Sequence, residues 1–301
     1  MADKANIFTI DAFTGEKFKG NPAAVFLDDR QETFSDDVLQ AIAREMNLSE
    51  TAFPRAISGD FQTASEFSLR WFTPTVEVAM CGHATMATSH VLFNEIGNRS
   101  DTLTFHTLSG PLHCRRGEGG AISMDFPHYE TTEVSLEGDD ETLPASGMLE
   151  ALTEVFEGVG CEVAEFGYAA SAKKLIIRIS TISAEEFESL KIDNSALTKA
   201  DPQGEVIRGV ILTQKAANTE LDFESRYFAP WVGIPEDSAT GAAHCALATF
   251  WCRNLEGRTE LKARQCYPGR GADFELTLDK LNSRVELRGR AVTVIRGRIK
   301  V

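Results

Sequence analysis

The residues whose types and spacing could do chemistry gather in two short segments, each of which ends at the start of a predicted helix. The first segment is Cys81-Gly82-His83, and the second is Asp237-Ser238-Ala239-Thr240-Gly241. The first turn of a helix leaves backbone N–H groups unpaired and carries about half a positive charge, so each segment could bind a carboxylate. Such a site would also stabilise an enediolate. The alternative is that the glycines only start packed helices, and composition does not decide between the two.

Three side chains beside these helix starts could take part directly. His83 follows a helix-starting glycine and could donate to a ligand or move a proton, and Asp237 could fix the tautomer of such a histidine. Cys81, at a helix N-terminus, is expected to have a lowered thiol pKa. Against these roles, a single histidine is more often structural, and cysteine is among the residue types most often buried without function.

A glutamate could supply the base. Glu45 lies in the last turn of a predicted helix, where the negative end of the dipole disfavours a charged carboxylate by roughly 0.3–1 kcal/mol. Partial burial beside Ile42 and Met46 would make it a general acid/base, and the competing interpretation is an exposed glutamate beside Arg44. Glu50 is a weaker candidate for the same role.

Motifs for nucleotides, metals and nucleophilic serine are absent from the sequence. It contains no GxGxxG followed by a helix, no complete phosphate loop, no GxSxG and no HExxH. Its six cysteines are scattered without a CxxC pair, which indicates neither a disulfide framework nor a zinc site. If the protein is an enzyme, the sequence therefore predicts that it works without metal, nucleotide cofactor or nucleophilic serine.

Two kinds of element must position these residues. Many short apolar runs bounded by turn residues, such as AAVFL, KLIIRIS and AVTVIRGRIKV, predict that most of the chain is sheet. Residues 35–47 predict an amphipathic helix, whereas residues 82–96 and 241–254 are apolar on nearly every side and predict buried helices. The fold class expected is α+β.

An internal repeat links the two buried helices. Arg70-Trp71-Phe72-Thr73-Pro74 precedes the first, and Arg226-Tyr227-Phe228-Ala229-Pro230 precedes the second about 156 residues later. This repeat predicts two similar lobes, each a curved sheet around one central helix. The lobes are expected at residues 1–118, together with a last strand at about 288–301, and at residues 119–287, with the active site in the cleft between them.

Length and charge exclude several classes of protein. A chain of 301 residues is expected to form two lobes, and its net charge of −15 disfavours partners such as nucleic acid and anionic membrane surfaces. No apolar run has the length of a signal peptide or of a membrane span. We therefore expect a cytoplasmic protein.

Five ordered segments resemble the PhzF family of phenazine biosynthesis-like isomerases. These are GNPAAVF at 20–26, IAREMNLSETAF at 42–53, RWFTPTVEV at 70–78, CGHAT at 81–85 and EDSATGAA at 236–243. The resemblance covers essentially the whole chain. It implies the diaminopimelate-epimerase fold, with two pseudo-symmetric lobes and the active site between them.

The resemblance also implies roles for individual residues. Glu45 is placed at the family's catalytic glutamate, which takes and returns a proton in an allylic hydrogen shift on a cyclic hydroxy-amino acid. His83 and Asp237 match residues that assist binding and proton movement. Gly82 and Gly241 match the glycines whose N–H groups bind the substrate carboxylate, with Cys81, Ser238 and Thr240 lining the same segments. The family acts without cofactor and is usually dimeric, so a homodimer is expected.

Departures from the family pattern leave other functions open. Ala242 stands where the phenazine enzyme has serine, and Cys81 precedes Gly82 as in the related two-cysteine racemases. The second segment has no cysteine, which makes a two-thiol racemase improbable. The remaining alternatives to a Glu45-dependent isomerase are an epimerase or racemase that depends on Cys81, and a binding or regulatory protein that keeps the fold without turnover.

Overall fold

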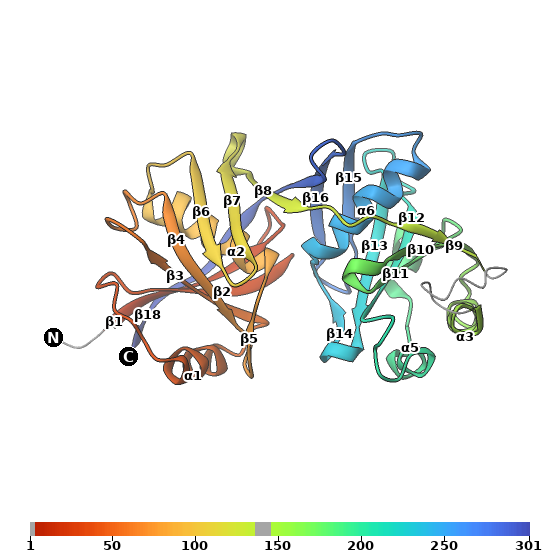
Figure 1. The fold of residues 1–301 in the computed structure, drawn as a ribbon, viewed down its shortest axis with the longest axis horizontal. Helices are drawn as coiled ribbons and strands as arrows, with labels where there is room; N and C mark the ends of the chain where they lie inside the picture. The colour runs from red at the N-terminus through yellow and green to blue at the C-terminus, as the bar shows by residue number, and fades with distance from the viewer. Residues whose placement is uncertain (1–3, 136–145) are drawn as a thin grey trace. The chain divides into compact units, whose positions relative to one another are not determined.

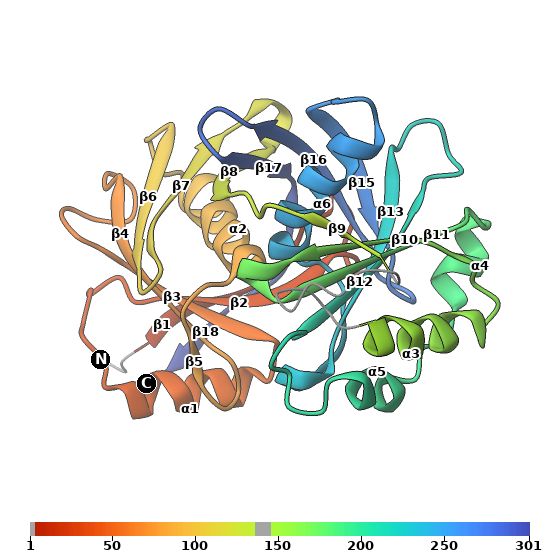
Figure 2. The same cartoon turned by 45° about the vertical axis from the view of Figure 1, so that its right-hand side comes forward.

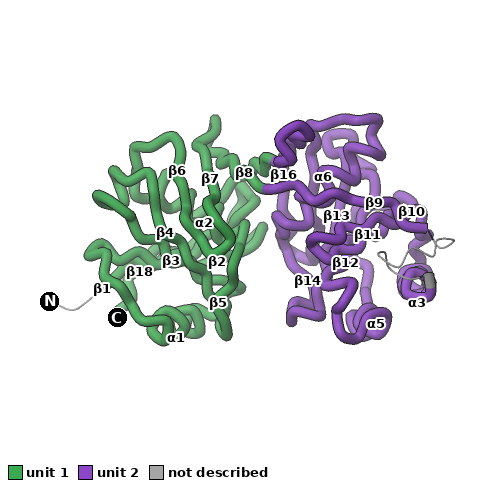
Figure 3. The backbone as a smooth tube through the Cα atoms, viewed as in Figure 1, with its two compact units in different colours: residues 1–126, 286–301 green, residues 127–285 purple. Residues whose placement is uncertain are grey.

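The computed structural model describes residues 4–135 and 146–301, and the chain divides into two compact units (Figure 3). Unit 1 consists of residues 1–126 and 286–301, and unit 2 of residues 127–285. The first boundary lies a few residues later than the sequence predicts, because the strand at 122–127 stays hydrogen-bonded to the strand before it. Unit 2 is therefore inserted into the chain of unit 1.

Unit 1 is built mostly from strands (Figure 1). Its elements in chain order are β1 (Lys4–Ala12), β2 (Asn21–Leu27), α1 (Asp36–Met46), β3 (Glu50–Ala56), β4 (Glu66–Phe72), β5 (Glu77–Val78), α2 (Gly82–His90), η1 (Val91–Ile96), β6 (Thr102–Thr107), β7 (Gly110–Arg116), η2 (Glu118–Gly120) and β8 (Ile122–Pro127), and after unit 2 come β17 (Arg284–Gly289) and β18 (Ala291–Lys300).

Unit 2 has a similar succession of strands and a central helix, with additional helices. Its elements are β9 (Thr132–Val134), α3 (Ser146–Glu157), β10 (Val163–Ala169), η3 (Ala170–Ala172), β11 (Lys174–Ile179), α4 (Ala184–Ser189), α5 (Asn194–Ala200), β12 (Gly209–Lys215), β13 (Phe223–Ala229), η4 (Pro230–Val232), β14 (Ile234–Asp237), α6 (Gly241–Asn254), β15 (Glu260–Gln265) and β16 (Ala272–Asp279).

The strand pairing of the two units is the same, so the predicted duplication is confirmed. In unit 1, β1 is antiparallel to β2, β2 is parallel to β3, β3 is antiparallel to β4, and β4 is parallel to β6. In unit 2, β10, β11, β12, β13 and β15 pair in the same directions and order. A short antiparallel strand, β5 or β14, then leads into the helix α2 or α6 in each unit.

The two helices α2 and α6 are buried, as their all-round apolar sequences predict. In unit 1, α2 packs against β1, β2, β3 and β18, and nearly all of its residues are inaccessible to solvent (Figures 1 and 2). In unit 2, α6 packs against β11 and β16, while α3 and α5 lie side by side (Figure 2). After His90, the helix of unit 1 continues as the π-helix η1 and ends at Gly97, whose φ of 72° favours glycine.

An arginine and a glutamate join the strands that lead into each buried helix. Arg70 of β4 binds Glu77 of β5 through Nε and Nη2, both at 2.7 Å. In unit 2, Arg226 binds Glu236 through the same two atoms at 2.7 and 2.9 Å. These bidentate contacts fix the geometry of the strands that place the helix starts. No helix among the described residues is long and apolar enough to cross a membrane.

Candidate active site

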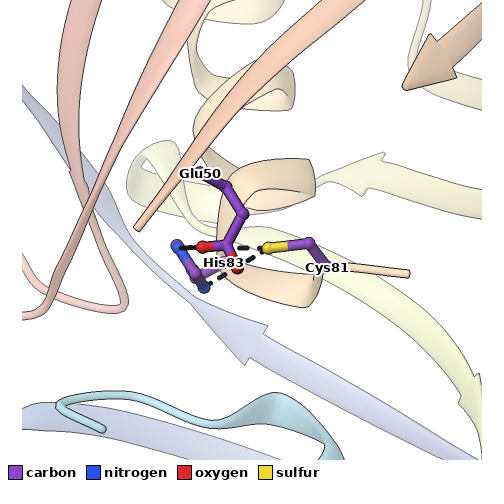
Figure 4. Close-up of side chains that lie close together, drawn as sticks. All are labelled: Glu50, Cys81 and His83. Atoms are coloured by element: carbon purple, nitrogen blue, oxygen red, sulfur yellow. Dashed lines mark hydrogen bonds and ion pairs between the residues drawn. The ribbon is translucent and has the colours of Figure 1, made fainter. Parts of the chain in front are cut away.

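Three side chains of unit 1 form one buried polar cluster (Figure 4). Glu50 begins β3, Cys81 immediately precedes α2, and His83 lies in the first turn of α2. Glu50 Oε2 lies 3.0 Å from His83 Nε2, and Cys81 Sγ lies 3.5 Å from His83 Nδ1. The cluster thus unites a carboxylate, an imidazole and a thiol, which are the groups used for acid–base chemistry.

The local sequence explains how Glu50 reaches this cluster. Helix α1 ends at Asn47, which adopts the left-handed conformation with φ of 49° and donates its N–H to the Ala43 carbonyl. The chain therefore turns within a few residues and enters β3. The parallel register of β2 and β3 pairs Glu50 with Ala23, on strands that both pack against α2.

Ser49 fixes one edge of the His83 ring. Its Oγ lies 3.1 Å from Nε2, and its hydroxyl donates to the Pro22 carbonyl at 3.1 Å, which leaves the oxygen to accept from a protonated ring. The amide group of Asn21 lies at the other edge, 3.4 Å from Nδ1.

The charges in the cluster depend on one another. Burial raises the pKa of Glu50, but the positive charge of His83 and its hydrogen bonds outweigh this, so the Glu50 pKa lies below its usual value. Burial lowers the pKa of His83, yet the charge of Glu50 and the hydrogen bonds with Cys81 and Glu50 raise it above the usual value of 6.5. At neutral pH the cluster consequently holds a carboxylate and an imidazolium.

Cys81 behaves differently from the sequence-based expectation. Burial, together with the negative charge of Glu50, raises the pKa of the Cys81 thiol. The prediction of a lowered pKa is wrong, because these two effects exceed the contributions of His83 and of the helix start. The thiol is therefore protonated at neutral pH and interacts with Glu50 as a neutral group (Figure 4).

The Glu50 carboxylate is enclosed by the other groups of the cluster. Its side chain is 13% exposed, and its Oε2 atom is buried 3.0 Å from His83 Nε2. Hydrogen bonds from His83, Ser49 and Cys81 stabilise its charged form. A carboxylate in contact with an imidazolium and a thiol can exchange a proton with a bound molecule.

Glu45 does not share this environment. It lies on the exposed face of α1, as the competing interpretation of the sequence has it, and the partial burial that an acid/base role would need is not present. Its neighbours Ile42 and Met46 face the core from the other side of the helix, and the Glu45 side chain forms no hydrogen bond or ion pair with the described residues. The structure thus brings Glu50 into the cluster with His83 and leaves Glu45 in solvent.

The predicted residues of unit 2 form a second polar group at the start of α6. Thr240 Oγ1 donates to Asp237 Oδ2 at 2.5 Å, and Ser238 is buried beside them. Gln265 of β15 fixes the segment, because its Oε1 accepts from the Thr240 N–H at 2.8 Å and its Nε2 donates to the Asp237 carbonyl at 2.6 Å. Sequence reasoning missed Gln265, since nothing in the sequence around it marks a contact with this segment.

Both helix starts have the open backbone groups that the sequence predicts. Helix α2 begins at Gly82 and helix α6 at Gly241. Neither preceding residue, Cys81 or Thr240, caps its helix with a side-chain hydrogen bond. First-turn N–H groups therefore remain for an anion in each unit.

The cluster of unit 1 also has a donor set that could ligate a divalent cation. One ligand atom from each of Glu50, Cys81 and His83 lies within 4.8 Å of the others, and three protein ligands are typical of catalytic zinc sites. Binding would require both His83 and Cys81 to lose protons.

Comparisons with known proteins agree with this architecture. The family model of phenazine biosynthesis-like proteins, PhzC-PhzF, matches residues 10–297. The chain is 43% identical to mouse phenazine biosynthesis-like domain-containing protein 1, and the alignment covers 98% of both sequences. It is 38% identical to an uncharacterized isomerase of Pseudomonas aeruginosa, with 97% of both sequences covered.

A solved structure extends the comparison to the fold. The crystal structure of a PhzF-family phenazine biosynthesis protein from Enterococcus faecalis has a TM-score of 0.81 and 32% identity, covering 99% of this chain and 100% of that one. The predicted α+β, diaminopimelate-epimerase-like fold is thereby confirmed. With the match of the family model over nearly its full length, the chain belongs to the PhzF family of phenazine biosynthesis-like proteins.

Proposed function

We propose that this protein is a cofactor-independent isomerase of a small carboxylate, with Glu50 as its general acid/base. The observation that carries the proposal is the buried contact of the Glu50 carboxylate with His83, at 3.0 Å, and with the Cys81 thiol. Family membership and the isomerase name of the P. aeruginosa relative support the reaction class. Glu50 thus takes the role that the resemblance of the sequence motifs implied for Glu45.

The proposed reaction is a proton transfer within one substrate molecule. Glu50 removes a proton from a carbon activated by a neighbouring carboxylate or double bond, and the C–H electron pair moves into the conjugated system. His83 and the N–H groups at the start of α2 stabilise the negative charge that develops. The protonated Glu50 then returns the proton to a different carbon, so atoms and charge balance.

In this proposal the start of α6, within unit 2, also binds polar groups of a small ligand. Thr240, Gly241 and Ser238 present polar and backbone groups at the start of α6, and Asp237 is fixed there by Thr240. These groups suit a carboxylate and a neighbouring hydroxyl or amino substituent. A homodimer in the cytoplasm remains part of the proposal, and analytical ultracentrifugation of the purified protein tests the dimer.

A second candidate function is an epimerase or racemase that uses Cys81. The observation that favours it is the protonated Cys81 thiol within the same cluster as the Glu50 carboxylate. One group could remove a proton from a carbon while the other delivers a proton to the same carbon. In that case Cys81→Ser abolishes turnover, whereas the isomerase tolerates this substitution.

The experiment measures exchange of substrate hydrogen with solvent deuterium. The protein is incubated in D₂O with a panel of cyclic and acyclic amino- and hydroxycarboxylates, and NMR follows the loss of C–H signals. For a panel member that exchanges, Glu50→Gln should slow exchange by ~10²–10⁴-fold, the usual contribution of general acid–base catalysis.

Glu45→Gln is the matched control, because it makes the same chemical change on the exposed face of α1. We expect it to exchange at the wild-type rate. Normal exchange in Glu50→Gln would contradict the assignment of Glu50, and loss of exchange in Glu45→Gln would restore the assignment that the resemblance implied. Exchange by no panel member would favour the binding or regulatory protein.

A further inference from the structure

A second pair of polar side chains lies in unit 2, apart from the Glu50 cluster. Lys174 begins β11, and its Nζ donates to the hydroxyl of Tyr227 on β13 at 2.7 Å. The same ammonium lies 4.6 Å from the centre of the Tyr227 ring. Tyr227 is 6% exposed, whereas Lys174 is only partly buried and can be reached from solvent.

The structure makes space for this pair with a glycine on the strand between them. β12 lies between β11 and β13, and its residue opposite Lys174 is Gly209. A Cβ atom at Gly209 would overlap the hydroxyl and ring of Tyr227. The tyrosine ring therefore crosses β12 over a residue without a side chain, and only this allows it to reach the lysine.

The duplication relates this place to the Glu50 site. β3 and β12 occupy the same position in the two units, and their first residues are Glu50 and Gly209. Each of these pairs in parallel register with the neighbouring strand, Glu50 with Ala23 and Gly209 with Lys174. Unit 2 thus replaces the carboxylate of unit 1 by an amine and a phenol.

The hydrogen-bonding groups that Lys174 and Tyr227 leave unused are donors. Lys174 has three N–H groups and uses one for Tyr227. Because the Tyr227 oxygen accepts that bond, its own proton is available, and no described residue accepts it. No carboxylate of the described residues forms an ion pair with Lys174. Asp237 and Cys245 face the amine from β14 and α6 at longer range, and Asp237 already accepts from Thr240.

Because Lys174 is partly buried, the lack of an anion in contact with its amine affects its pKa. Burial lowers the pKa of Lys174 to about 8, because Asp237 and Cys245 compensate only part of the charge. Partly buried cations are normally paired with an anion. An acceptor with two oxygens would satisfy both the remaining ammonium protons and the tyrosine hydroxyl.

We propose that Lys174 and Tyr227 form a binding site for the carboxylate group of a small ligand. The two donor atoms lie 2.7 Å apart, so the two oxygens of one carboxylate can each meet one of them. The site is defined within unit 2 alone. It goes beyond the proton transfer assigned to Glu50 and does not depend on it.

The test uses malonate as the probe and the lysine itself as the reporter. In protein labelled with ¹³C-lysine, the ¹³Cε signal of Lys174 follows protonation of its amine, and Lys174→Met identifies the signal. Without malonate the signal should titrate with a midpoint near pH 8. Saturating malonate should raise the midpoint by about one pH unit, because an anion favours the charged amine.

Two variants give the proposal its control. Tyr227→Phe keeps the ring but removes the hydroxyl, and we expect about tenfold weaker binding of malonate at Lys174. Lys173→Met removes the neighbouring lysine, whose amine instead donates to the Glu205 carbonyl, and should change neither midpoint nor affinity. If Lys174→Met does not fold, the shift of the signal in Tyr227→Phe identifies it.

A midpoint that does not respond to malonate in the wild-type protein would overturn the proposal and leave Lys174 and Tyr227 as an internal contact. Equal affinity in Tyr227→Phe and wild type would also overturn it. Because the reporter is local to Lys174, neither result bears on hydrogen exchange by Glu50.

Discussion

The two units share the same strand pairing but carry side chains of opposite charge at the matching place in the sheet. At the first residue of β3, unit 1 has Glu50, beside the imidazolium of His83 in α2. At the matching residue of β12, unit 2 has Gly209, and the space is filled by Tyr227 and the amine of Lys174. The comparison teaches that duplication preserved the strand pairing and the helix starts while the chemistry diverged through a few side chains.

The histidines of the two buried helices show the same divergence. His83 of α2 lies beside a carboxylate and is protonated at neutral pH. His244 of α6 stacks on Phe274 with ring centres 3.6 Å apart, and burial lowers its pKa to about 4, so it is neutral. Helix α2 therefore supplies charge to its site, whereas α6 supplies only backbone and Thr240.

The largest expected effect concerns the arginines that join strands in each unit. Arg226 is 2% exposed and also donates to the Phe187 and Leu190 carbonyls, at 3.0 and 2.8 Å. Arg226→Met should lower the free energy of unfolding by about 3–5 kcal/mol, because it leaves Glu236 and two carbonyls without their partner. Urea unfolding measures this.

Arg70→Met is the matched change in unit 1, where the arginine is 35% exposed. Solvent screens its contacts with Glu77 and Asp36, and we expect a cost of at most about 1 kcal/mol. Equal costs for the two variants would show that burial does not distinguish the two ion pairs.

The next effect is a dependence of stability on pH that comes from His244. The unfolded histidine binds its proton near pH 6.5 and the folded one only near pH 4. Its contribution is therefore complete above pH 6.5 and is lost as the pH falls towards 4, by about 3 kcal/mol at most. His83 has the opposite sign, since its raised pKa adds stability that is present below pH 6.5 and lost at higher pH.

His244→Gln should remove about half of the histidine-dependent stability loss between pH 6.5 and 4, as followed by urea unfolding across that range. His90, whose pKa burial also lowers to about 4, contributes the other half. His113→Gln, on an exposed strand position, is the control that makes the same substitution outside the core. An unchanged pH dependence in His244→Gln would mean that the ring is not neutral in the folded protein.

The smallest effect is on the reactivity of Cys81. Burial and the charge of Glu50 raise its thiol pKa, so Glu50→Gln should lower that pKa and speed alkylation at pH 8. Peptide mass spectrometry after iodoacetamide treatment measures the rate. Cys114, whose pKa burial raises to about 12, serves as an internal reference that stays unreactive. If Cys81 reacts at the same rate in both proteins, the charge of Glu50 does not control it.

Much of the fold was predictable from the sequence because the signals were local or repeated. The apolar runs predicted strands, the all-round apolar segments predicted buried helices, and the two RxFxP segments predicted the duplication that the strand pairing confirms. The positions of Cys81, His83 and Asp237 beside the helix starts followed from the glycines at 82 and 241.

The side chains that complete each site depended on tertiary pairing instead. Glu50 reaches His83 only because β3 pairs in parallel with β2, a register that no local pattern specifies. Glu45 and Glu50 are five residues apart, and the turn at Asn47 sends one into solvent and the other into the core. Gln265 and Lys174 likewise act on partners far along the chain, and sequence spacing carries no information about such contacts.

The return of the chain to unit 1 has a consequence for synthesis of the protein. β18 pairs with β1 along nearly its whole length, from Lys4 opposite Lys300 to Ala12 opposite Ala291. During synthesis, all of unit 2 is made before this strand of unit 1. The cluster of Glu50, His83 and Cys81 therefore lies in a unit whose sheet can close only after the chain has passed through unit 2, and unit 2 holds all of its own strands before unit 1 does.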